Sequence, residues 1–341
     1  MEKVVTRELF QKAENEGWIK SQKHPEFDLY IYNYTPNAQY ERMWDEVTLA
    51  ARGLIVDANF NIIARPFPKF FNWEELQPEQ IPIMDFEVYE KMDGSLGILY
   101  WYEGKPFIAT RGSFSSDQAG KANELLFGKY KDVLEKLNPD CTYLFEIIYP
   151  ENRIVLDYGE REELVLLAII ETKTGKEYPL KNIGFPVVTQ YKGIRDLQKI
   201  RELNDDNKEG FVIRFANNFR MKIKFQEYIR LHRILTQVSS VTIWEYLKEG
   251  LSFEELLDKV PDEFYTWVRR TCSGLIKQYK EIEQQSRKEF KILENRKETA
   301  LYFLTTKYPQ VLFAMLDQRD YSSIIWKMVR PEFEKPFTEK I

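Results

Sequence analysis

Several lysines and acidic residues in this 341-residue sequence flank predicted strands, where they could serve as nucleophiles or phosphate-binding groups. The first is Lys91 in Lys-Met-Asp-Gly-Ser, between the strand-like runs Phe86–Tyr89 and Leu96–Trp101. A lysine amine is a nucleophile once it has lost its proton, which burial or a neighbouring cation favours, and Gly94 would let a ligand come close. The alternative is an exposed lysine before an Asp-Gly turn that joins two strands.

Two further lysines and an acidic residue lie later in the chain. Glu209 and Gly210 lead into an apolar run, and Met221-Lys222-Ile223-Lys224 follows. Side chains alternate along a strand, so we expect Lys222 and Lys224 on one face. Like charges side by side destabilise a sheet unless something anionic lies between them, and a nucleotide phosphate would serve. The alternative is a solvated edge strand, where lysines hinder aggregation.

A single acid, Glu146, interrupts the apolar run Phe145-Glu-Ile-Ile148. If its face of the strand is buried, the carboxylate is costly unless it is paired or hydrogen-bonded, and a ribose hydroxyl is a suitable partner. The alternative is a glutamate on the wet face of a half-exposed strand. A last group consists of cations near strands and turns, each of which by itself is more typical of a solvated surface: Arg52, Arg65, Lys69 and Arg111.

The composition excludes several other kinds of site. The chain has only two histidines, His24 and His232, which argues against histidine-based metal sites and Ser-His-Asp catalysis. Two cysteines, Cys141 and Cys272, cannot form a disulfide framework or a four-cysteine zinc site and fit a reducing compartment. No apolar run is long enough for a membrane span, and the charged N-terminus predicts that the protein is not exported. A net charge of −5 leaves nucleic acid open as a partner, because local charge decides binding.

The elements that would position these residues change in character near residue 235. Before that point, short apolar or alternating runs between Gly, Pro, Asn and Asp predict a largely antiparallel sheet system. The predicted strands are Leu29–Tyr34, Gly53–Asp57, Asn61–Ala64, Leu96–Trp101, Tyr143–Tyr149, Leu164–Ile170 and Gly210–Phe215. The predicted helices among them are Thr6–Gly17, Asp117–Leu137 and Ile194–Leu203.

From about Thr236 onward, apolar residues recur at spacings of three and four, which predicts helices. The predicted segments are Ser240–Glu249, Ser252–Lys259, Pro261–Tyr279 and Lys280–Lys307. The sequence therefore predicts an α+β domain over residues 1–236 and an all-helical domain over residues 237–341.

In chain order, the candidate groups form one pattern: Arg52-Gly, Lys69-Phe-Phe, Lys91-x-Asp-Gly-Ser, Arg111-Gly-Ser, Phe-Glu146, Glu209-Gly and Lys222-x-Lys224. This order resembles that of the covalent nucleotidyltransferases, the superfamily of ATP-dependent ligases and mRNA capping enzymes. Within it, the chain is most similar to the phage RNA ligase 1 family, from about Tyr30 to Tyr228. The stretches that carry this narrower resemblance are Arg65-Pro-Phe-Pro-Lys-Phe-Phe-Asn72, Lys91-Met-Asp-Gly-Ser-Leu96, Asn152-Arg-Ile-Val-Leu-Asp-Tyr158 and Glu209-Gly-Phe-Val212.

The resemblance implies an antiparallel-sheet nucleotidyltransferase domain (an ATP-grasp-like ligase domain) and a three-step reaction. Lys91 would attack the α-phosphate of ATP and release pyrophosphate, which leaves a lysyl-AMP intermediate. AMP would then pass to the 5′-phosphate of an RNA end. A 3′-hydroxyl would finally displace AMP and form a phosphodiester bond.

The resemblance also implies roles for the cations. Lys222 and Lys224 are expected at the α-phosphate and around Lys91, where cations would favour the neutral amine and offset charge on the phosphate oxygens. Arg52 and Lys69 are expected near the phosphates, including the leaving pyrophosphate or the RNA 5′-phosphate. Where the phage type member has a lysine before Gly-Ser, this chain has Arg111, so a planar fork replaces a point donor at an expected phosphate contact.

The remaining site residues are expected around the nucleoside and the metal. The resemblance implies that Glu146 contacts the ribose hydroxyl. Phe71 lies where the family has an aromatic residue near the nucleotide. Backbone groups around Glu90 and Met92 are expected to select adenine, beside Gly94. The resemblance also implies that Glu209 acts either at the metal or on the ribose side of the nucleotide. The metal is expected to be Mg²⁺ or Mn²⁺, held largely by phosphates and water.

The expected partner is RNA with 5′-phosphate and 3′-hydroxyl ends, with a nicked tRNA as one candidate in RNA repair. We expect a monomer in the cytoplasm, or in the host cytoplasm if a phage encodes it. Alternatives are a DNA ligase or a GTP-using capping-type enzyme, which usually carry an oligonucleotide-binding barrel where helices are predicted here. A non-catalytic RNA-binding relative is a further alternative, although the motif residues are all present.

Basic residues of the predicted helical domain alternate with glutamates, as in Arg287 and Lys288 beside Glu283 and Glu289. Mixed signs at helical spacing are typical of a solvated face supported by ion pairs. The alternative is a surface that recognises a particular RNA.

Overall fold

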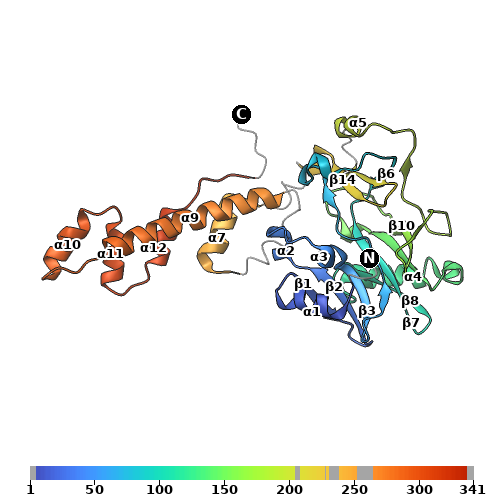
Figure 1. The fold of residues 1–341 in the computed structure, drawn as a ribbon, viewed down its shortest axis with the longest axis horizontal. Coiled ribbons are helices and arrows are strands. Elements are labelled where there is room, and N and C mark those ends of the chain that lie inside the picture. The colour runs from blue at the N-terminus through green and yellow to red at the C-terminus, as the bar shows by residue number, and fades with distance from the viewer. Residues whose placement is uncertain (1–4, 204–207, 227, 230–237, 252–263, 336–341) are drawn as a thin grey trace. The chain divides into compact units, whose positions relative to one another are not determined.

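The computed structural model of the protein describes residues 5–203, 208–226, 228–229, 238–251 and 264–335. The chain divides into two units, Met1–Leu235 and Thr236–Ile341. The described part of the first unit consists of three sheets with short helices, and that of the second consists of helices (Figure 1). The predicted mixed α+β class with antiparallel sheets is therefore confirmed.

The first sheet is an antiparallel meander near the N-terminus. Its strands follow one another in the order β1-β2-β3-β4, with bounds Ile19–Lys23, Leu29–Tyr34, Arg52–Asp57 and Ile62–Ala64. Helices α1 (Arg7–Asn15), α2 (Pro36–Tyr40) and α3 (Glu46–Ala50) belong to the same region. One side of the sheet packs on the fully buried Phe10 of α1.

The second sheet has the order β11-β10-β9-β7-β8. Its strands are β7 (Ser95–Tyr102), β8 (Lys105–Thr110), β9 (Cys141–Ile148), β10 (Glu163–Glu171) and β11 (Glu177–Tyr178). One face packs on residues of α4 (Asp117–Phe127) and the 3₁₀ helix η3 (Lys131–Lys136). Part of the other face packs on the first sheet, because Leu144 and Ile98 share a core with Ile31 and Ile55.

The third sheet has the order β12-β6-β13-β14-β5, with only the β14–β5 pair parallel. Its strands are β5 (Phe71–Asn72), β6 (Phe86–Lys91), β12 (Gln190–Tyr191), β13 (Gly210–Phe215) and β14 (Arg220–Lys224). One face is an apolar core that also contains Ile200 of α5 (Leu197–Glu202). Because side chains alternate, the opposite face carries Lys91, Lys222 and Lys224, so one sheet supplies both a core and a charged surface.

The described helices of the second unit are α7 (Ser240–Glu249), α9 (Tyr265–Glu289), α10 (Arg296–Leu304), α11 (Pro309–Leu316) and α12 (Ser322–Met328). Val268 and Leu275 on α9 and Phe303 on α10 are buried apolar residues of this unit. Within the ranges that the structure covers, no helix is long and apolar enough to cross a membrane.

All seven strands predicted from the runs before residue 235 are present, but several helix boundaries were wrong. The predicted helix Asp117–Leu137 ends at Phe127, because Gly128 caps α4 with its N–H on the Glu124 carbonyl and a 3₁₀ helix follows. The predicted helix Ile194–Leu203 begins only at Leu197, where the Asp196 side chain caps it.

Two boundaries in the second unit were also wrong. The predicted break between residues 279 and 280 does not exist, since α9 continues to Glu289 with no glycine or proline to stop it. The predicted segment Lys280–Lys307 is instead interrupted by residues 290–295, after which the Asn295 side chain caps α10. The predicted segment Ser252–Lys259 lies outside the described residues.

Candidate active site

The Lys91 motif connects two different sheets. Lys91 is the last residue of β6 in the third sheet, and Ser95 is the first residue of β7 in the second. Asp93 and Gly94 do join two strands, but these belong to different sheets and do not form a hairpin. The motif instead lies where the charged face of the third sheet meets the second sheet, as Met92 shows by packing against Ile148 and Val165.

Lys91, Gly210 and Lys224 lie on one rung of the third sheet. Gly210 pairs with Lys91 of β6 on one side and with Lys224 of β14 on the other, so the three residues share a face. Gly210 has a φ of +147°, and a Cβ added there would lie 1.9 Å from the Ile223 carbonyl oxygen. Only glycine fits this position, because any side chain would overlap the backbone of β14 beside Lys224.

Glu209 bridges the two lysines of this rung. Its Oε2 accepts from Lys91 Nζ at 2.6 Å, and its Oε1 lies 3.0 Å from Lys224 Nζ. The Glu209 side chain is 3% exposed, Lys224 9% and Lys91 20%. The anion that neighbouring lysines require is thus supplied by the protein itself.

The charge of Glu209 results from opposing effects. Burial by itself raises the pKa of Glu209, but the ammonium groups of Lys91 and Lys224 outweigh it and hold the pKa below its ordinary value. The surroundings of Lys91 are therefore not purely cationic, in contrast to the expectation from the sequence.

Glu146 enters the same region from β9 of the second sheet. Its Oε1 accepts a hydrogen bond from the Gly94 N–H at 3.0 Å. A Cβ on Gly94 would lie 2.7 Å from the Ile147 carbonyl oxygen, so glycine is needed for this approach. Burial raises the pKa of Glu146 to about 7, and Glu209 and Asp93 act in the same direction, while Lys91 opposes the shift.

Lys222 lies between Arg220 and Lys224 on the charged face of β14, opposite Asn72 of β5. Because β5 pairs along it, β14 is not the edge strand of the third sheet. The edge-strand explanation for the two lysines is therefore wrong. Alternation along the strand does place Lys222 and Lys224 on one face, as the sequence predicts.

Asp93, which the sequence analysis did not single out, anchors the motif. Its buried carboxylate accepts hydrogen bonds from the N–H groups of Val155 and Leu156 at 2.9 and 2.8 Å and from the Tyr228 hydroxyl at 2.8 Å. The Asp93 N–H donates to the Tyr158 hydroxyl at 2.9 Å. The acidic residue of the motif therefore holds Lys91 in place. The resemblance over residues 152–158 was the one signal in the sequence that this segment belongs to the site.

Three aromatic rings surround the Lys69 ammonium. Its Nζ lies 5.5 Å from the ring centre of Tyr34, 5.4 Å from that of Trp44 and 5.4 Å from that of Phe71. Arg111 stacks on Tyr34 at 5.3 Å and donates to its hydroxyl at 3.1 Å. Lys69, Phe71 and Arg111 were predicted site residues, whereas Tyr34 and Trp44 were missed, because no sequence spacing connects them to Lys69.

Arg52 and Arg65 differ in their surroundings. The Arg52 guanidinium lies 5.3 Å from the ring centre of Phe70. Arg65 is buried, and it donates to the carbonyl oxygens of Thr172 at 2.8 Å and Lys173 at 3.2 Å. Arg65 is therefore part of the internal framework and not the solvated residue that its sequence context favours.

Glu90 and Met92 flank Lys91 in the chain and differ from it in direction. Glu90 lies on the face of β6 opposite Lys91, where its carboxylate accepts from the Tyr191 hydroxyl at 3.4 Å. The Met92 side chain is 7% exposed in a small apolar cluster.

The acidic groups suit a metal that is held mainly by other ligands. Among the described residues there is no group of three or more His, Cys, Asp or Glu side chains that could hold a metal ion. Both oxygens of Glu209 face an ammonium group. A metal would therefore be held mainly by phosphates and water, with Glu209 as the described carboxylate that could also meet it.

A family model described as RNA ligase, of the T4 type, matches residues 50–228. The chain belongs to this RNA ligase family. The matched region begins before Arg52, ends at Tyr228, and contains every predicted site residue.

Similar proteins cover the chain to different extents. An RNA ligase of Rhodothermus phage RM378 is 27% identical over 92% of this chain and 89% of its own length. The "Putative bifunctional polynucleotide kinase/RNA ligase" of Autographa californica nuclear polyhedrosis virus is 28% identical over 66% of this chain, which spans only 36% of that protein. A solved archaeal ATP-dependent RNA ligase is 16% identical over 88% of this chain and 86% of its own, with a TM-score of 0.47, too low to add to the assignment.

We expect the Gly210→Ala substitution to lower the free energy of unfolding by about 2–4 kcal/mol, because the added Cβ would overlap the Ile223 carbonyl oxygen. Gly17→Ala is the matched control, since Gly17 also has a positive φ (+79°) but nothing within 4 Å of an added Cβ. Urea denaturation followed by tryptophan fluorescence measures both. Equal losses in the two variants would show that the close approach at Gly210 is unimportant.

The raised pKa of Glu146 predicts a pH-dependent stability. The carboxyl group titrates near 4.5 when unfolded and near 7 when folded, so the folded state keeps a proton that the unfolded state loses. The stabilisation is complete below pH 4.5 and is lost as the pH rises through 7. We expect the difference in unfolding free energy between the wild type and Glu146→Gln to fall by on the order of 3 kcal/mol between pH 4 and pH 8. A constant difference in denaturation experiments would contradict this.

Proposed function

We propose that this protein is an ATP-dependent RNA ligase that joins 5′-phosphate and 3′-hydroxyl RNA ends through a lysyl-AMP intermediate on Lys91. The observation that supports it most is the Lys91–Glu209–Lys224 arrangement, within a chain of the RNA ligase family. It provides a partly accessible amine and a carboxylate that holds it. A second amine lies on the other side of the same carboxylate.

In the first step, Lys91 Nζ forms a bond to the α-phosphorus of ATP while the bond from that phosphorus to the bridging oxygen breaks and pyrophosphate leaves. Lys91 must first lose a proton to solvent, which the cations of β14 favour, and the Glu209 carboxylate at 2.6 Å holds the amine in position. Lys222 and Lys224 offset the negative charge that develops on the phosphate oxygens.

The other predicted residues surround the rest of the nucleotide and the RNA end. Lys69 and Arg111 lie in one aromatic cluster, which suits an anionic group, and we assign the outer phosphates or the RNA 5′-phosphate to them together with Arg52. Glu146 binds the ribose, because its raised pKa gives it a proton to donate near neutral pH as well as an acceptor oxygen. Phe71 lies near the nucleotide, and backbone groups around Glu90 and Met92 select adenine.

A bound Mg²⁺ or Mn²⁺ would neutralise phosphate charge, with Glu209 as the nearby carboxylate. In the second step, the AMP phosphorus is transferred from Lys91 to an RNA 5′-phosphate, so the N–P bond breaks and a new phosphoanhydride bond forms. In the third, an RNA 3′-hydroxyl attacks the 5′-phosphate and AMP departs. Lys91 already regains its free amine in the second step, when the N–P bond breaks.

We assign RNA selection, with a nicked tRNA as one candidate, to the helical second unit of a cytoplasmic monomer. Part of its mixed charge is used in ion pairs, such as Glu283–Arg287 at 3.0 Å and Arg296–Asp317 at 2.7 Å. These pairs favour a solvated face over a general RNA surface. Because RNA selection is assigned to the second unit, a truncated chain ending near residue 240 should still seal a plain oligonucleotide and lose any preference for tRNA.

The direct test is incubation with α-labelled ATP and Mg²⁺ or Mn²⁺, followed by denaturing electrophoresis and then by addition of 5′-phosphorylated RNA. We expect label on the protein that RNA chases into adenylylated RNA and free AMP. Parallel reactions with labelled GTP and with DNA ends should be much weaker. Absence of protein-bound label, or a preference for GTP or DNA, would overturn the proposal.

A further inference from the structure

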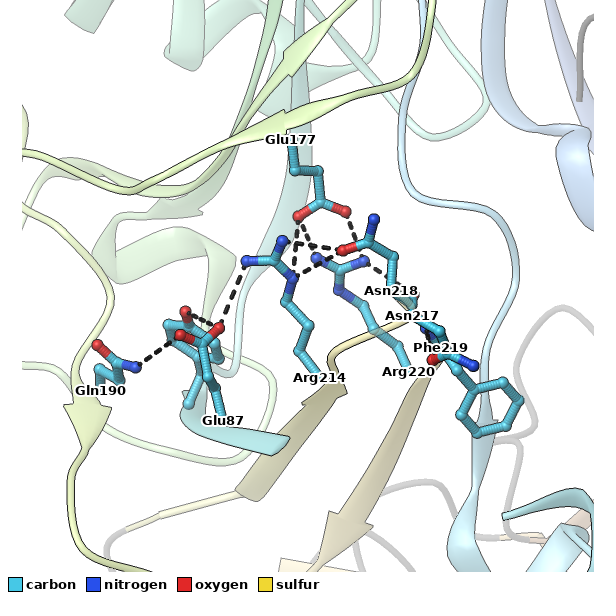
Figure 2. A network of polar contacts seen from close by, with 9 residues as sticks. Glu87, Glu177, Gln190, Arg214, Asn217, Asn218, Phe219 and Arg220 are labelled. Carbon is cyan, nitrogen blue, oxygen red and sulfur yellow. Dashed lines mark hydrogen bonds and ion pairs between the residues drawn. The ribbon is translucent and has the colours of Figure 1, made fainter. Parts of the chain in front are cut away.

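The hairpin formed by β10 and β11 (Glu163–Tyr178) contacts two cation-bearing segments of the site. Its last strand supplies Glu177, whose carboxylate meets two arginines of the third sheet. Figure 2 shows the guanidinium groups of Arg214 and Arg220 converging on Glu177. These contacts join the second sheet to the third at the end of the charged face away from Lys91.

The pair between Arg220 and Glu177 is buried and bidentate. Arg220 Nη1 donates to Glu177 Oε1 at 2.7 Å, and Nη2 donates to Oε2. The side chains are 8% and 9% exposed. The Arg220 guanidinium also lies 4.2 Å from the ring centre of Phe67. A buried pair of this geometry fixes position more than it adds stability.

Arg220 lies two residues before Lys222 on the same face of β14. Three cations therefore alternate along five residues, and the two outer ones each meet a buried carboxylate: Glu177 at Arg220 and Glu209 at Lys224. On its outer edge, β14 pairs only with the two residues of β5. The two ion pairs hold the ends of a strand that has little support on that edge, with Lys222 between them.

The same hairpin also holds the segment that leads to Lys69. Arg65 donates to the carbonyl oxygens of Thr172 and Lys173 in the turn between β10 and β11. A Cβ on Gly175, which has a φ of +76°, would lie 3.2 Å from Arg65 Cδ. Arg65 and Phe67 precede Lys69 in the chain by four and two residues. One hairpin is thus in contact with the supports of both Lys222 and Lys69.

We propose that Glu177 is a positioning residue for nucleotide transfer, which through Arg220 holds Lys222 in register with Lys91 and Lys224. This rests on the proposed function, because it assigns Lys222 a task at the phosphate. Arg220 itself is committed to Glu177 and Phe67 and does not touch the nucleotide. A small displacement of the Lys222 side chain would weaken its phosphate contacts in the transition state. The fold would stay intact.

Glu177→Gln tests this, because it keeps the shape and removes the charge that holds Arg220. The measurement is single-turnover formation of the protein–AMP adduct at several ATP concentrations. It separates the rate constant at saturating ATP from the amplitude, which reports the fraction of active protein. We expect the rate constant to fall by about tenfold to hundredfold, with an amplitude near that of the wild type. A merely structural role would lower the amplitude and leave the rate constant unchanged.

Glu87→Gln is the matched control. Glu87 belongs to the same network, at 3.4 Å from Arg214 Nη1, but it is 46% exposed and joins strands of one sheet only. Its rate constant should stay within about twofold of the wild type. An equal fall in both variants would overturn the proposal, as would a wild-type rate constant in Glu177→Gln.

Arg220→Lys serves if Glu177→Gln does not fold. It keeps the charge but loses the second hydrogen bond, so the rate constant should again fall at unchanged amplitude. Wild-type protein that forms no adduct would overturn the proposed function itself. Wild-type labelling with unaffected variants would overturn only the role of Glu177.

Discussion

Replacing Lys91 with alanine is expected to abolish formation of the protein–AMP adduct, by on the order of 10⁴-fold or more. The reason is that the described lysine on the same rung, Lys224, lies on the other side of Glu209, with its Nζ 3.0 Å from Oε1. It cannot reach the position of Lys91 Nζ without leaving that carboxylate. α-Labelled ATP followed by denaturing electrophoresis measures the effect.

The same variant should still seal RNA that already carries AMP on its 5′-phosphate, because that step needs the phosphate-binding cations and no amine nucleophile. We expect sealing of pre-adenylylated RNA to stay within about tenfold of the wild type. Loss of both activities would indicate a damaged site, whereas retained labelling would assign the nucleophile to another residue.

Two controls accompany this experiment. Lys91→Arg keeps a cation that can pair with Glu209 but offers no amine to form the adduct, so it should fold like the wild type and remain unlabelled. Lys105→Ala removes an exposed lysine at the start of β8 and should label normally.

Replacing Asp93 with alanine is expected to lower the free energy of unfolding of the first unit by about 3–5 kcal/mol. The substitution removes the acceptor of three hydrogen bonds at 2.8–2.9 Å and leaves the N–H groups of Val155 and Leu156 buried without it. Buried donors that lose their acceptor carry the full cost of desolvation. Urea denaturation and thermal melting measure the loss.

Asp93→Asn provides the comparison, since its amide oxygen can still accept from the two backbone N–H groups and its amide N–H₂ can donate to the Tyr228 oxygen. We expect it to recover most of the stability. If alanine were as well tolerated as asparagine, the hydrogen bonds of Asp93 would not be what holds the motif in place.

Much of the first unit could be predicted from the sequence because its strands are short apolar runs between turn residues. The run Gly210–Phe215 is a strand with those bounds, and Lys222 and Lys224 share a face because a strand alternates. Strand β1 was missed, since its polar sequence Ile19-Lys-Ser-Gln-Lys23 gives no apolar pattern. The predicted helix boundaries were wrong where a side-chain cap determines the first residue of the helix, as Asn295 does for α10. The apolar spacing does not show such a cap.

The site could be predicted only as a set of residues. The order of the motifs predicts that Lys91, Glu209 and Lys224 belong to one site. In the structure, Glu209 forms ion pairs with both lysines. The sequence context of Arg65 predicts a solvated side chain, whereas the structure buries it against two carbonyl groups. Tyr34 and Trp44 precede the first motif in the chain, and Glu177 lies between the motifs of Glu146 and Glu209. No local spacing rule connects these three residues to the site.

By itself, the sequence determined which residue types are present, how they alternate along strands, and that the motif order is the one RNA ligases have. The tertiary structure decided which strand lies beside which, and therefore that one glutamate bridges two lysines and that a hairpin of the second sheet supports the third. The reason is that alternation follows from the geometry of a single strand, whereas the partner of a side chain depends on how separate sheets pack.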